Sequence, residues 1–191
     1  MRDLSLHLLD LLGNSVKARA THISTRISAD PRADLLSVGI EDDGCGMDKA
    51  LLDAVSDPFT TTRTTRSVGL GVPLFKEAVE SAGGTFRIDS EPGRGTALTG
   101  TFRIGHIDRL PLGDLGATFS VLVRSEPGMD FTLELSADGR GYRFSTREVR
   151  DALDGAPLDE PDVLAWIEES IAEGQREVFH GILPEIGTGE P

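Results

Sequence analysis

Three short glycine-bearing strings in the first half of the chain constrain its fold more than any other feature. They are LLDLLGNSVKA at residues 8–18, EDDGCGMD at 41–48 and SVGLGVPLFK at 67–76. The apolar spacing of the first string predicts a helix. The second follows a run with strand character and turns sharply, and the third leads from a glycine pair into another helix.

The first string predicts a helix over 4–18 with two polar residues on one face. Asp10 and Asn14 are four residues apart and therefore share a face. Their carboxylate and amide oxygens suit a magnesium ion that keeps part of its water shell, and a carboxylate beside such an ion can orient or deprotonate a water. The string is also consistent with an amphipathic surface helix whose polar residues face solvent.

The second string places a carboxylate and two glycines at the end of a strand over 35–41. Asp42 is followed by Gly44 and Gly46, and glycine lets a ligand approach the main chain closely. This arrangement suits recognition of a flat heterocycle that carries an exocyclic amine. Asp-Asp-Gly is also an ordinary turn sequence, so the string alone does not decide between the two.

The third string predicts a helix over 71–81 that begins at Gly69-Leu70-Gly71. Exposed amides at a helix start, with the positive end of the helix dipole behind them, bind phosphate. Pro73 fits the first turn, where its missing amide hydrogen would have no helical partner. The alternative is a loop and cap without a ligand.

The order and spacing of these strings resemble one known family. Together with Gly93-Arg94-Gly95-Thr96, they resemble the ATP-binding domain shared by gyrase, the heat-shock chaperone of that ATPase class, sensor histidine kinases and MutL (GHKL). The resemblance covers roughly residues 3 to 104 and is closest to the histidine-kinase-like members. It implies an α+β fold of the Bergerat type, a two-layer α/β sandwich with helices on one face of a mixed sheet.

The resemblance also implies roles for individual residues at the base end of a nucleotide. Asp42 matches the aspartate that binds the adenine amine directly and through water, and Thr96 matches a threonine that supports that water network. Gly44 and Gly46 match the glycines that let the chain pass close to the base. Met47 directly follows them and is included in the predicted site.

Further matches fall at the phosphate end. Asn14 matches the asparagine that coordinates Mg²⁺, and Lys17 matches a lysine near the phosphates. Asp10 stands where related ATPases keep a glutamate as general base, so this carboxylate is one methylene shorter. The segment 57–63 resembles the phenylalanine box and the start of the lid. This segment adds Phe59, Thr62 and Arg63 to the predicted site. The start of the helix that follows it adds Gly69, Leu70 and Gly71.

Composition and charge divide the chain. Residues 1–107 carry 12 basic and 14 acidic side chains, whereas 108–191 carry 7 basic and 18 acidic ones. We therefore predict a GHKL-like ATP-binding domain over 1–107 and an acidic C-terminal extension, a small α+β appendage, over 108–191. The acidity argues against binding to nucleic acid or anionic lipid.

The 191 residues contain one cysteine, Cys45, and no apolar run long enough to cross a bilayer. No signal peptide is recognisable at Met1-Arg2-Asp3, so we expect a cytoplasmic protein. Cys45 is expected to be an inert small residue, and His7 a partly exposed histidine on the first helix.

The remaining elements are expected from periodicity and turn signals. Strands are predicted over 21–28, 85–90, 96–103, 118–124, 130–136 and 142–144. Further helices are predicted from the Asp48 cap to Val55, from the Ser145–Glu148 capping box to about Leu153, and over 161–173.

Two functions follow from the resemblance. In the first, the protein binds Mg-ATP and acts as a histidine-kinase-like or anti-sigma-like kinase on a separate, unidentified protein partner that carries the phosphoacceptor. In the second, ATP drives a conformational switch with slow hydrolysis and no phosphotransfer. We expect no phosphoacceptor histidine within the chain, and a homodimer stays open.

Overall fold

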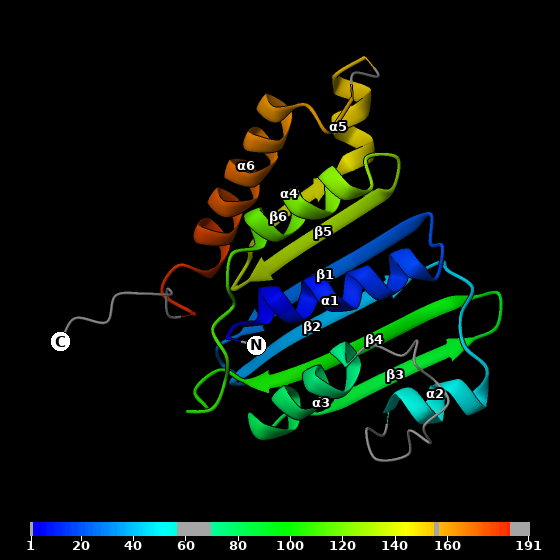
Figure 1. Ribbon diagram of the computed structural model, residues 1–191. Helices are drawn as coiled ribbons and strands as arrows, with labels where there is room; N and C mark the ends of the chain where they lie inside the picture. Colours follow the sequence, from blue (N-terminus) through cyan, green and yellow to red (C-terminus); the bar gives the residue numbers. More distant parts are fainter. Residues whose placement is uncertain (1, 57–69, 155–156, 184–191) are drawn as a thin grey trace.

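The computed structural model describes residues 2–56, 70–154 and 157–183 and contains one six-stranded sheet (Figure 1). The strands are β1 (His22–Asp30), β2 (Leu35–Asp42), β3 (Phe86–Glu91), β4 (Gly95–Arg103), β5 (Asp130–Ala137) and β6 (Arg140–Ser145). The helices are α1 (Leu4–Lys17), α2 (Lys49–Ser56), α3 (Gly71–Ser81), α4 (Leu115–Ser125), α5 (Thr146–Ala152) and α6 (Pro161–Phe179).

The sheet is mixed, with the strand order β3-β4-β2-β1-β5-β6. β1 pairs antiparallel with β2 and parallel with β5. In this register Ile27 of β1 lies opposite Val38 on one side and Leu135 on the other, so three apolar side chains form a row across the sheet.

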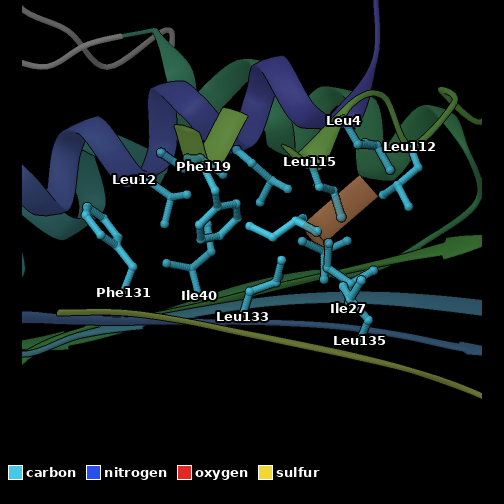
Figure 2. Close-up of a cluster of buried hydrophobic side chains, with 14 of the residues drawn as sticks. Leu4, Leu12, Ile27, Ile40, Leu112, Leu115, Phe119, Phe131, Leu133 and Leu135 are labelled. Carbon is cyan, nitrogen blue, oxygen red and sulfur yellow. The ribbon is translucent and has the colours of Figure 1, made fainter. Parts of the chain in front are cut away.

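Among the residues that the structure describes, one face of the sheet is buried and the other is open. Burial alternates along β1, as expected for a strand with one face against the core. Helices α1, α3 and α4 lie over that face, and Figure 2 shows leucine and phenylalanine side chains from α1 and α4 meeting those of the strands. The opposite face carries charged residues such as Arg26, which pairs with Glu134 at 2.9 Å. The predicted α+β fold, a mixed sheet with helices on one face, is confirmed.

Side-chain caps fix where several helices begin. The carboxylate of Asp3 accepts from the amide of Leu6 at the start of α1, and Asp48 Oδ1 accepts from Leu51 N at 2.8 Å at the start of α2. Ser145 caps α5 by accepting from the amide of Glu148. The caps predicted at Asp48 and Ser145 are therefore confirmed.

One element was predicted wrongly. The segment Thr118–Arg124 is rich in β-branched and apolar residues, which predicted a strand, but it lies inside helix α4. Asp114 caps this helix by accepting from Ala117 N at 2.9 Å, and the buried Leu115, Phe119 and Leu122 recur at helical spacing. Packing against α1 and α6 therefore overrides the local β propensity. The last predicted helix, over 161–173, extends further, to Phe179.

The sheet does not end at residue 107, where the family motifs end. β5 and β6 continue it beyond β1, and the buried core includes residues from both sides of that position, such as Leu8 and Phe131. In the part of the chain that the structure describes, no helix is both long and apolar enough to span a membrane.

Candidate functional site

A cavity of about 450 Å³ opens between α1, the end of β2 and the β3–β4 hairpin. Most of its wall is apolar, and a few polar groups converge on it, as is typical of small-molecule sites. The apolar wall is formed by Leu11, Ile40, Leu51, Val55, Val72, Ile88 and Leu98. The remaining lining residues are Asn14, Ser15, Lys17, Ala18, Asp42, Cys45, Gly46, Met47 and Thr96.

Asp42, the last residue of β2, is held by one hydrogen bond on each carboxylate oxygen. Ser15 Oγ donates to Oδ2 at 2.6 Å, and the amide of Gly44 donates to Oδ1 at 2.9 Å. Ser15 lies on α1 and is only 4% exposed. These two bonds fix the carboxylate at the cavity while leaving acceptor capacity on both oxygens.

The loop after Asp42 can pass close to two other segments because it contains glycines. Gly46 has φ +65°, and a Cβ there would lie 1.9 Å from the carbonyl oxygen of Glu91. Gly44 is packed against Ala18, whose Cβ and carbonyl oxygen would each lie 2.9 Å from an added Cβ. Main-chain bonds complete the path, from Cys45 N to Ala18 O at 2.9 Å and from Gly93 N to Cys45 O at 2.7 Å.

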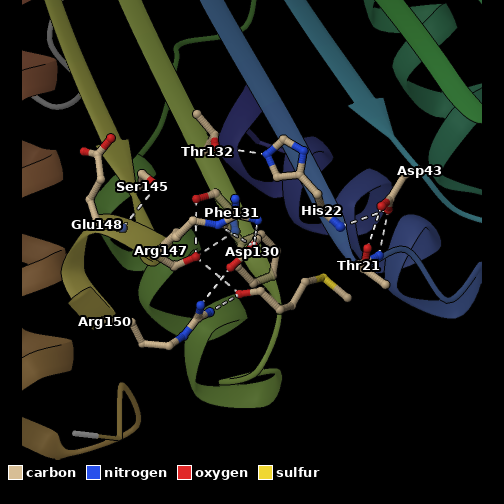
Figure 3. Close-up of polar contacts among 12 residues, drawn as sticks. Thr21, His22, Asp43, Asp130, Phe131, Thr132, Ser145, Arg147, Glu148 and Arg150 are labelled. Carbon is tan, nitrogen blue, oxygen red and sulfur yellow. Dashed lines mark hydrogen bonds and ion pairs between the residues drawn. The ribbon is translucent and has the colours of Figure 1, made fainter. Parts of the chain in front are cut away.

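Asp43 anchors the same loop to the start of β1 (Figure 3). Its carboxylate accepts from Thr21 N at 2.7 Å, Thr21 Oγ1 at 2.6 Å and His22 N at 2.9 Å. Desolvation of the carboxylate opposes ionisation, but these hydrogen bonds outweigh it and lower the pKa of Asp43. Asp42 and its neighbour are thus held from opposite sides, by α1 and by β1.

A second hydroxyl network lies at the β3–β4 side of the cavity. Ser90 Oγ accepts from Met47 N at 2.9 Å, lies 2.8 Å from the carbonyl oxygen of Gly95, and contacts Thr96 Oγ1 at 3.1 Å. It therefore links the loop after β2 to both strands of the hairpin. Thr96, opposite Asp42 in the β2–β4 register, faces the cavity.

The start of α3 lies against α1 at the other end of the cavity. A Cβ on Gly71 would be 3.2 Å from Cβ of Asp10 and 3.6 Å from Nδ2 of Asn14. Leu70 occupies the N-cap position of α3, and its apolar side chain cannot cap the helix. An amide oxygen, a carboxylate and a helix N-terminus beside one another are groups that fit a phosphate chain carrying Mg²⁺. Within the described residues, no three His, Cys, Asp or Glu side chains are grouped to hold a metal by themselves.

His7 is buried, contrary to the expectation of a partly exposed residue. It is only 3% exposed, and its ring meets Phe75 of α3 edge-on with the centroids 6.0 Å apart. Burial lowers the pKa of His7 and outweighs the opposing effect of Asp10 and Asp3. The contact with α3 explains the difference, since the sequence did not reveal which helix covers this face.

The structure brings most of the predicted site residues together. Asn14, Lys17, Asp42, Gly46, Met47 and Thr96 line the cavity, and Gly44 and Gly71 flank it. Asp10 is exposed and lies beside Gly71, outside the lining, and Leu70 is 71% exposed. Phe59, Thr62, Arg63 and Gly69 lie outside the described residues.

Sequence reasoning missed Ser15, Ser90 and the apolar wall. The spacing of Leu11 and Ser15, one helical turn apart, could have placed Ser15 on the buried face of α1. Ser90 carries no comparable signal, because its role depends on the pairing of β3 with β4.

Comparisons with known proteins match the first half of the chain. Residues 2–106 match the family model described as histidine kinase-, DNA gyrase B-, and HSP90-like ATPase. The "Non-motile and phage-resistance protein" of Caulobacter vibrioides is 33% identical over 111 residues, 53% of this chain and 13% of that protein. The "Signal transduction histidine-protein kinase AtoS" of Escherichia coli is 36% identical over 93 residues, 48% of this chain and 15% of that protein.

The chain thus spans less than a fifth of the length of these two relatives. Among solved structures, the Aquifex aeolicus MutL ATPase domain complexed with ADP aligns with a TM-score of 0.49 and 15% identity, covering 81% of this chain and 70% of that one. Because the family model matches more than half of the residues, this chain belongs to the family of histidine kinase-, DNA gyrase B- and HSP90-like ATPases.

Proposed function

We propose that this protein binds Mg-ATP in the cavity and transfers the γ-phosphoryl group to a separate protein partner. The observation that carries the proposal is the half-buried carboxylate of Asp42, held at the cavity by Ser15 and by the Gly44 amide. It stands at the end of a mainly apolar cavity that suits a flat purine. The family match and the kinase relatives support the same reading.

In this proposal the two ends of the cavity have different tasks. Asp42 accepts hydrogen bonds from the exocyclic amine of adenine, and Met47, Ile88 and Leu98 enclose the ring. At the other end, Asn14 holds the magnesium ion that accompanies the phosphates, and that ion neutralises part of their charge. Lys17 also lines the cavity and adds a positive charge to it.

The amides at the start of α3 complete the phosphate site. Gly71 leaves room for close approach to Asp10 and Asn14, and the helix dipole favours negative charge at this point. Positioning and electrostatic stabilisation supply most of the catalysis in phosphoryl transfer, so these groups support transfer to an acceptor brought by a partner.

Calorimetry of the full chain with ATP and Mg²⁺ tests the binding step. Asp42→Asn replaces one acceptor oxygen with a donor and is expected to weaken ATP binding by at least about tenfold. The matched control is Asp89→Asn, an exposed aspartate on β3 that pairs with Arg87 and lies outside the cavity lining. Wild-type protein that gives no heat at millimolar ATP would refute the proposal.

A second candidate is slow ATP hydrolysis that drives a conformational switch. The proximity of Asp10 to Gly71 and Asn14 favours it, because a carboxylate beside the phosphate site can activate water. Incubation with γ-labelled ATP separates the two. Label on a partner protein from the cell extract supports the kinase, whereas release of inorganic phosphate supports the ATPase.

Asp10→Asn refines this second test. The variant is expected to lose hydrolysis while ATP affinity stays within about twofold, because the side chain does not line the cavity. Hydrolysis at the wild-type rate would show that Asp10 is not the base.

A further inference from the structure

Two serines beside the cavity have each committed their only hydroxyl proton to another protein group. Ser15 Oγ lies 2.6 Å from Oδ2 of Asp42, and Ser90 Oγ lies 2.8 Å from the carbonyl oxygen of Gly95. A carboxylate and a carbonyl can only accept, so each serine must be the donor. Neither serine has a proton left for a ligand.

This assignment fixes the direction of the contact between Ser90 and Thr96. Their oxygens are 3.1 Å apart, and either could donate. Because the proton of Ser90 goes to Gly95, Thr96 is the donor. Ser90 also accepts from Met47 N at 2.9 Å, so both its lone pairs and its proton are used. The Thr96 hydroxyl can therefore offer a ligand only lone pairs.

Asp42 offers the same kind of group. Its Oδ2 accepts from Ser15 and its Oδ1 accepts from the Gly44 amide, which leaves each oxygen with capacity to accept once more. Asp42 and Thr96 lie opposite each other in the β2–β4 register, and both line the cavity. This end of the cavity therefore presents acceptors from both strands.

We propose that Ser15 and Ser90 are positioning residues that set nucleobase selectivity. By consuming the hydroxyl protons, they leave the Asp42 carboxylate and the Thr96 hydroxyl as acceptors only, which take the exocyclic amine of an aminopurine and disfavour a purine with a carbonyl at that carbon. This inference rests on the proposed nucleotide site. Its content is distinct, since it assigns selectivity to two residues that need not touch the base.

The test compares ATP with inosine triphosphate, which carries a carbonyl in place of the amine. Calorimetry of the full chain with each nucleotide and Mg²⁺ gives the ratio of the two Kd values. Wild-type protein is expected to prefer ATP by at least about tenfold, because the carbonyl of inosine triphosphate would face acceptors, while its N1–H can still donate to Asp42. A loss of purine fit alone would weaken both nucleotides equally and leave the ratio unchanged.

Ser15→Ala frees the Asp42 carboxylate to rotate and is expected to weaken ATP binding about tenfold while affecting inosine triphosphate less. Ser90→Ala frees the Thr96 proton to turn toward the cavity. It is expected to strengthen inosine triphosphate binding and to lower the ratio about tenfold as well. Ser15→Thr keeps the donor and is expected to keep the wild-type ratio.

Ser5→Ala is the matched control. Ser5 is a buried serine on the same helix, 4% exposed, and its hydroxyl donates to Asp3 Oδ1 at 2.8 Å, away from the cavity lining. Its removal should leave the ratio unchanged. If Ser15→Ala does not fold, Ser90→Ala carries the test.

The outcomes separate this inference from the proposed function. If wild-type protein binds ATP but the folded serine variants keep its selectivity, or if wild-type protein binds both nucleotides equally, the inference is wrong and the nucleotide site stands. If wild-type protein binds neither nucleotide, the site itself is refuted and the inference falls with it.

Discussion

Two glycines beside the cavity, Gly46 and Gly93, are required for different physical reasons. Gly46 and Gly93 both have positive φ, +65° and +75°, which side chains disfavour. They differ in the space around them, because a Cβ on Gly46 would lie 1.9 Å from the carbonyl oxygen of Glu91, whereas one on Gly93 would meet nothing within 4 Å. The first position therefore needs glycine for both conformation and close approach, and the second for conformation alone.

Replacing each of these glycines with alanine measures the two contributions separately. Gly93→Ala is expected to cost about 1–2 kcal/mol of unfolding free energy, from backbone strain. Gly46→Ala is expected to cost more than about 3 kcal/mol, because the main chain must also shift, and to weaken ATP binding. Urea unfolding of both variants provides the measurement. Equal destabilisation would mean that the loop moves away from Glu91 without cost.

His7 is expected to make stability depend on pH. Burial lowers the pKa of His7 in the folded protein below 6.5, its value in the unfolded chain. Folding therefore favours the neutral ring. The contribution of His7 to the free energy of unfolding is therefore complete above pH 6.5. It is lost as the pH falls through the lowered pKa of the folded state.

His7→Leu keeps an apolar contact with Phe75 and removes the titration. On acidification from about pH 7.5 to about pH 5.5, the Tm of wild-type protein is expected to fall more than that of this variant. The difference between the two slopes isolates His7 from the carboxylates. Parallel slopes would contradict the assigned burial effect.

At the scale of elements, the sequence predicted what local signals determine. α1, α2 and α3 were predicted within one residue because capping residues or glycines mark their ends, and β2 because a turn follows it. α4 was predicted as a strand because residues 118–124 are rich in β-branched and apolar residues, and the Asp114 cap was not recognised from the sequence. The pairing of β5 with β1 carries no local signal, because parallel neighbours depend on packing between distant segments.

The candidate site shows the same division. The motif residues are recognisable from the sequence, and six of the predicted site residues line the cavity. Ser15 bonds to Asp42, 27 positions away, and Ser90 bonds to the amide of Met47, 43 positions away, so these contacts are visible only in the fold. His7 was misjudged for the same reason, because α3 covers it.

The short helix α5 is attached to the start of β5 by two arginines (Figure 3). Arg150 Nη1 donates to Asp130 Oδ1 at 2.8 Å and its Nη2 donates to the carbonyl of Met129 at 2.8 Å, while Arg147 also binds Asp130. The Arg150 side chain is 28% exposed and that of Arg147 is 70% exposed. The less exposed ion pair, between Arg150 and Asp130, is therefore expected to contribute more to stability.

Arg150→Met, which keeps the aliphatic stem, is expected to lower the unfolding free energy by about 1–2 kcal/mol. Arg147→Met is the matched control, with a smaller loss of unfolding free energy.

Asp130 is expected to make stability depend on pH. Burial raises the pKa of Asp130, but the hydrogen bonds from Arg150 and Arg147 outweigh it and lower the pKa below 3.8. The contribution of Asp130 is therefore present above pH 3.8 and lost as the pH falls through the lowered value. Urea unfolding at neutral and acidic pH should show that the unfolding free energy of Arg150→Met depends less on pH than that of wild-type protein.

For the whole molecule, the central question is whether residues 1–107 can fold without the acidic remainder. β1 lies inside the sheet, paired on both sides, and its outer neighbour β5 comes from beyond residue 107. Main-chain bonds also join the start of α1 to the segment before α4, from Leu4 N to Pro111 O and from Ser5 N to Leu112 O, both at 2.9 Å. The fully buried Phe119 and Phe131 pack edge-on in the same core.

A chain that ends at residue 107 would lose these partners. Its β1 would become an edge strand with unpaired backbone groups, and α1 would expose the leucines that α4 covers (Figure 2). We expect this truncated chain to aggregate or to unfold without a cooperative transition, and to bind ATP at least about tenfold more weakly, because α1 carries Asn14 and Ser15. A chain ending at residue 183 retains all the contacts described and serves as the control. Thermal unfolding and ATP calorimetry of the two chains decide the matter: cooperative unfolding with full affinity in the shorter one would establish residues 1–107 as an independent domain, and the shared sheet would then be an interface between two folding units.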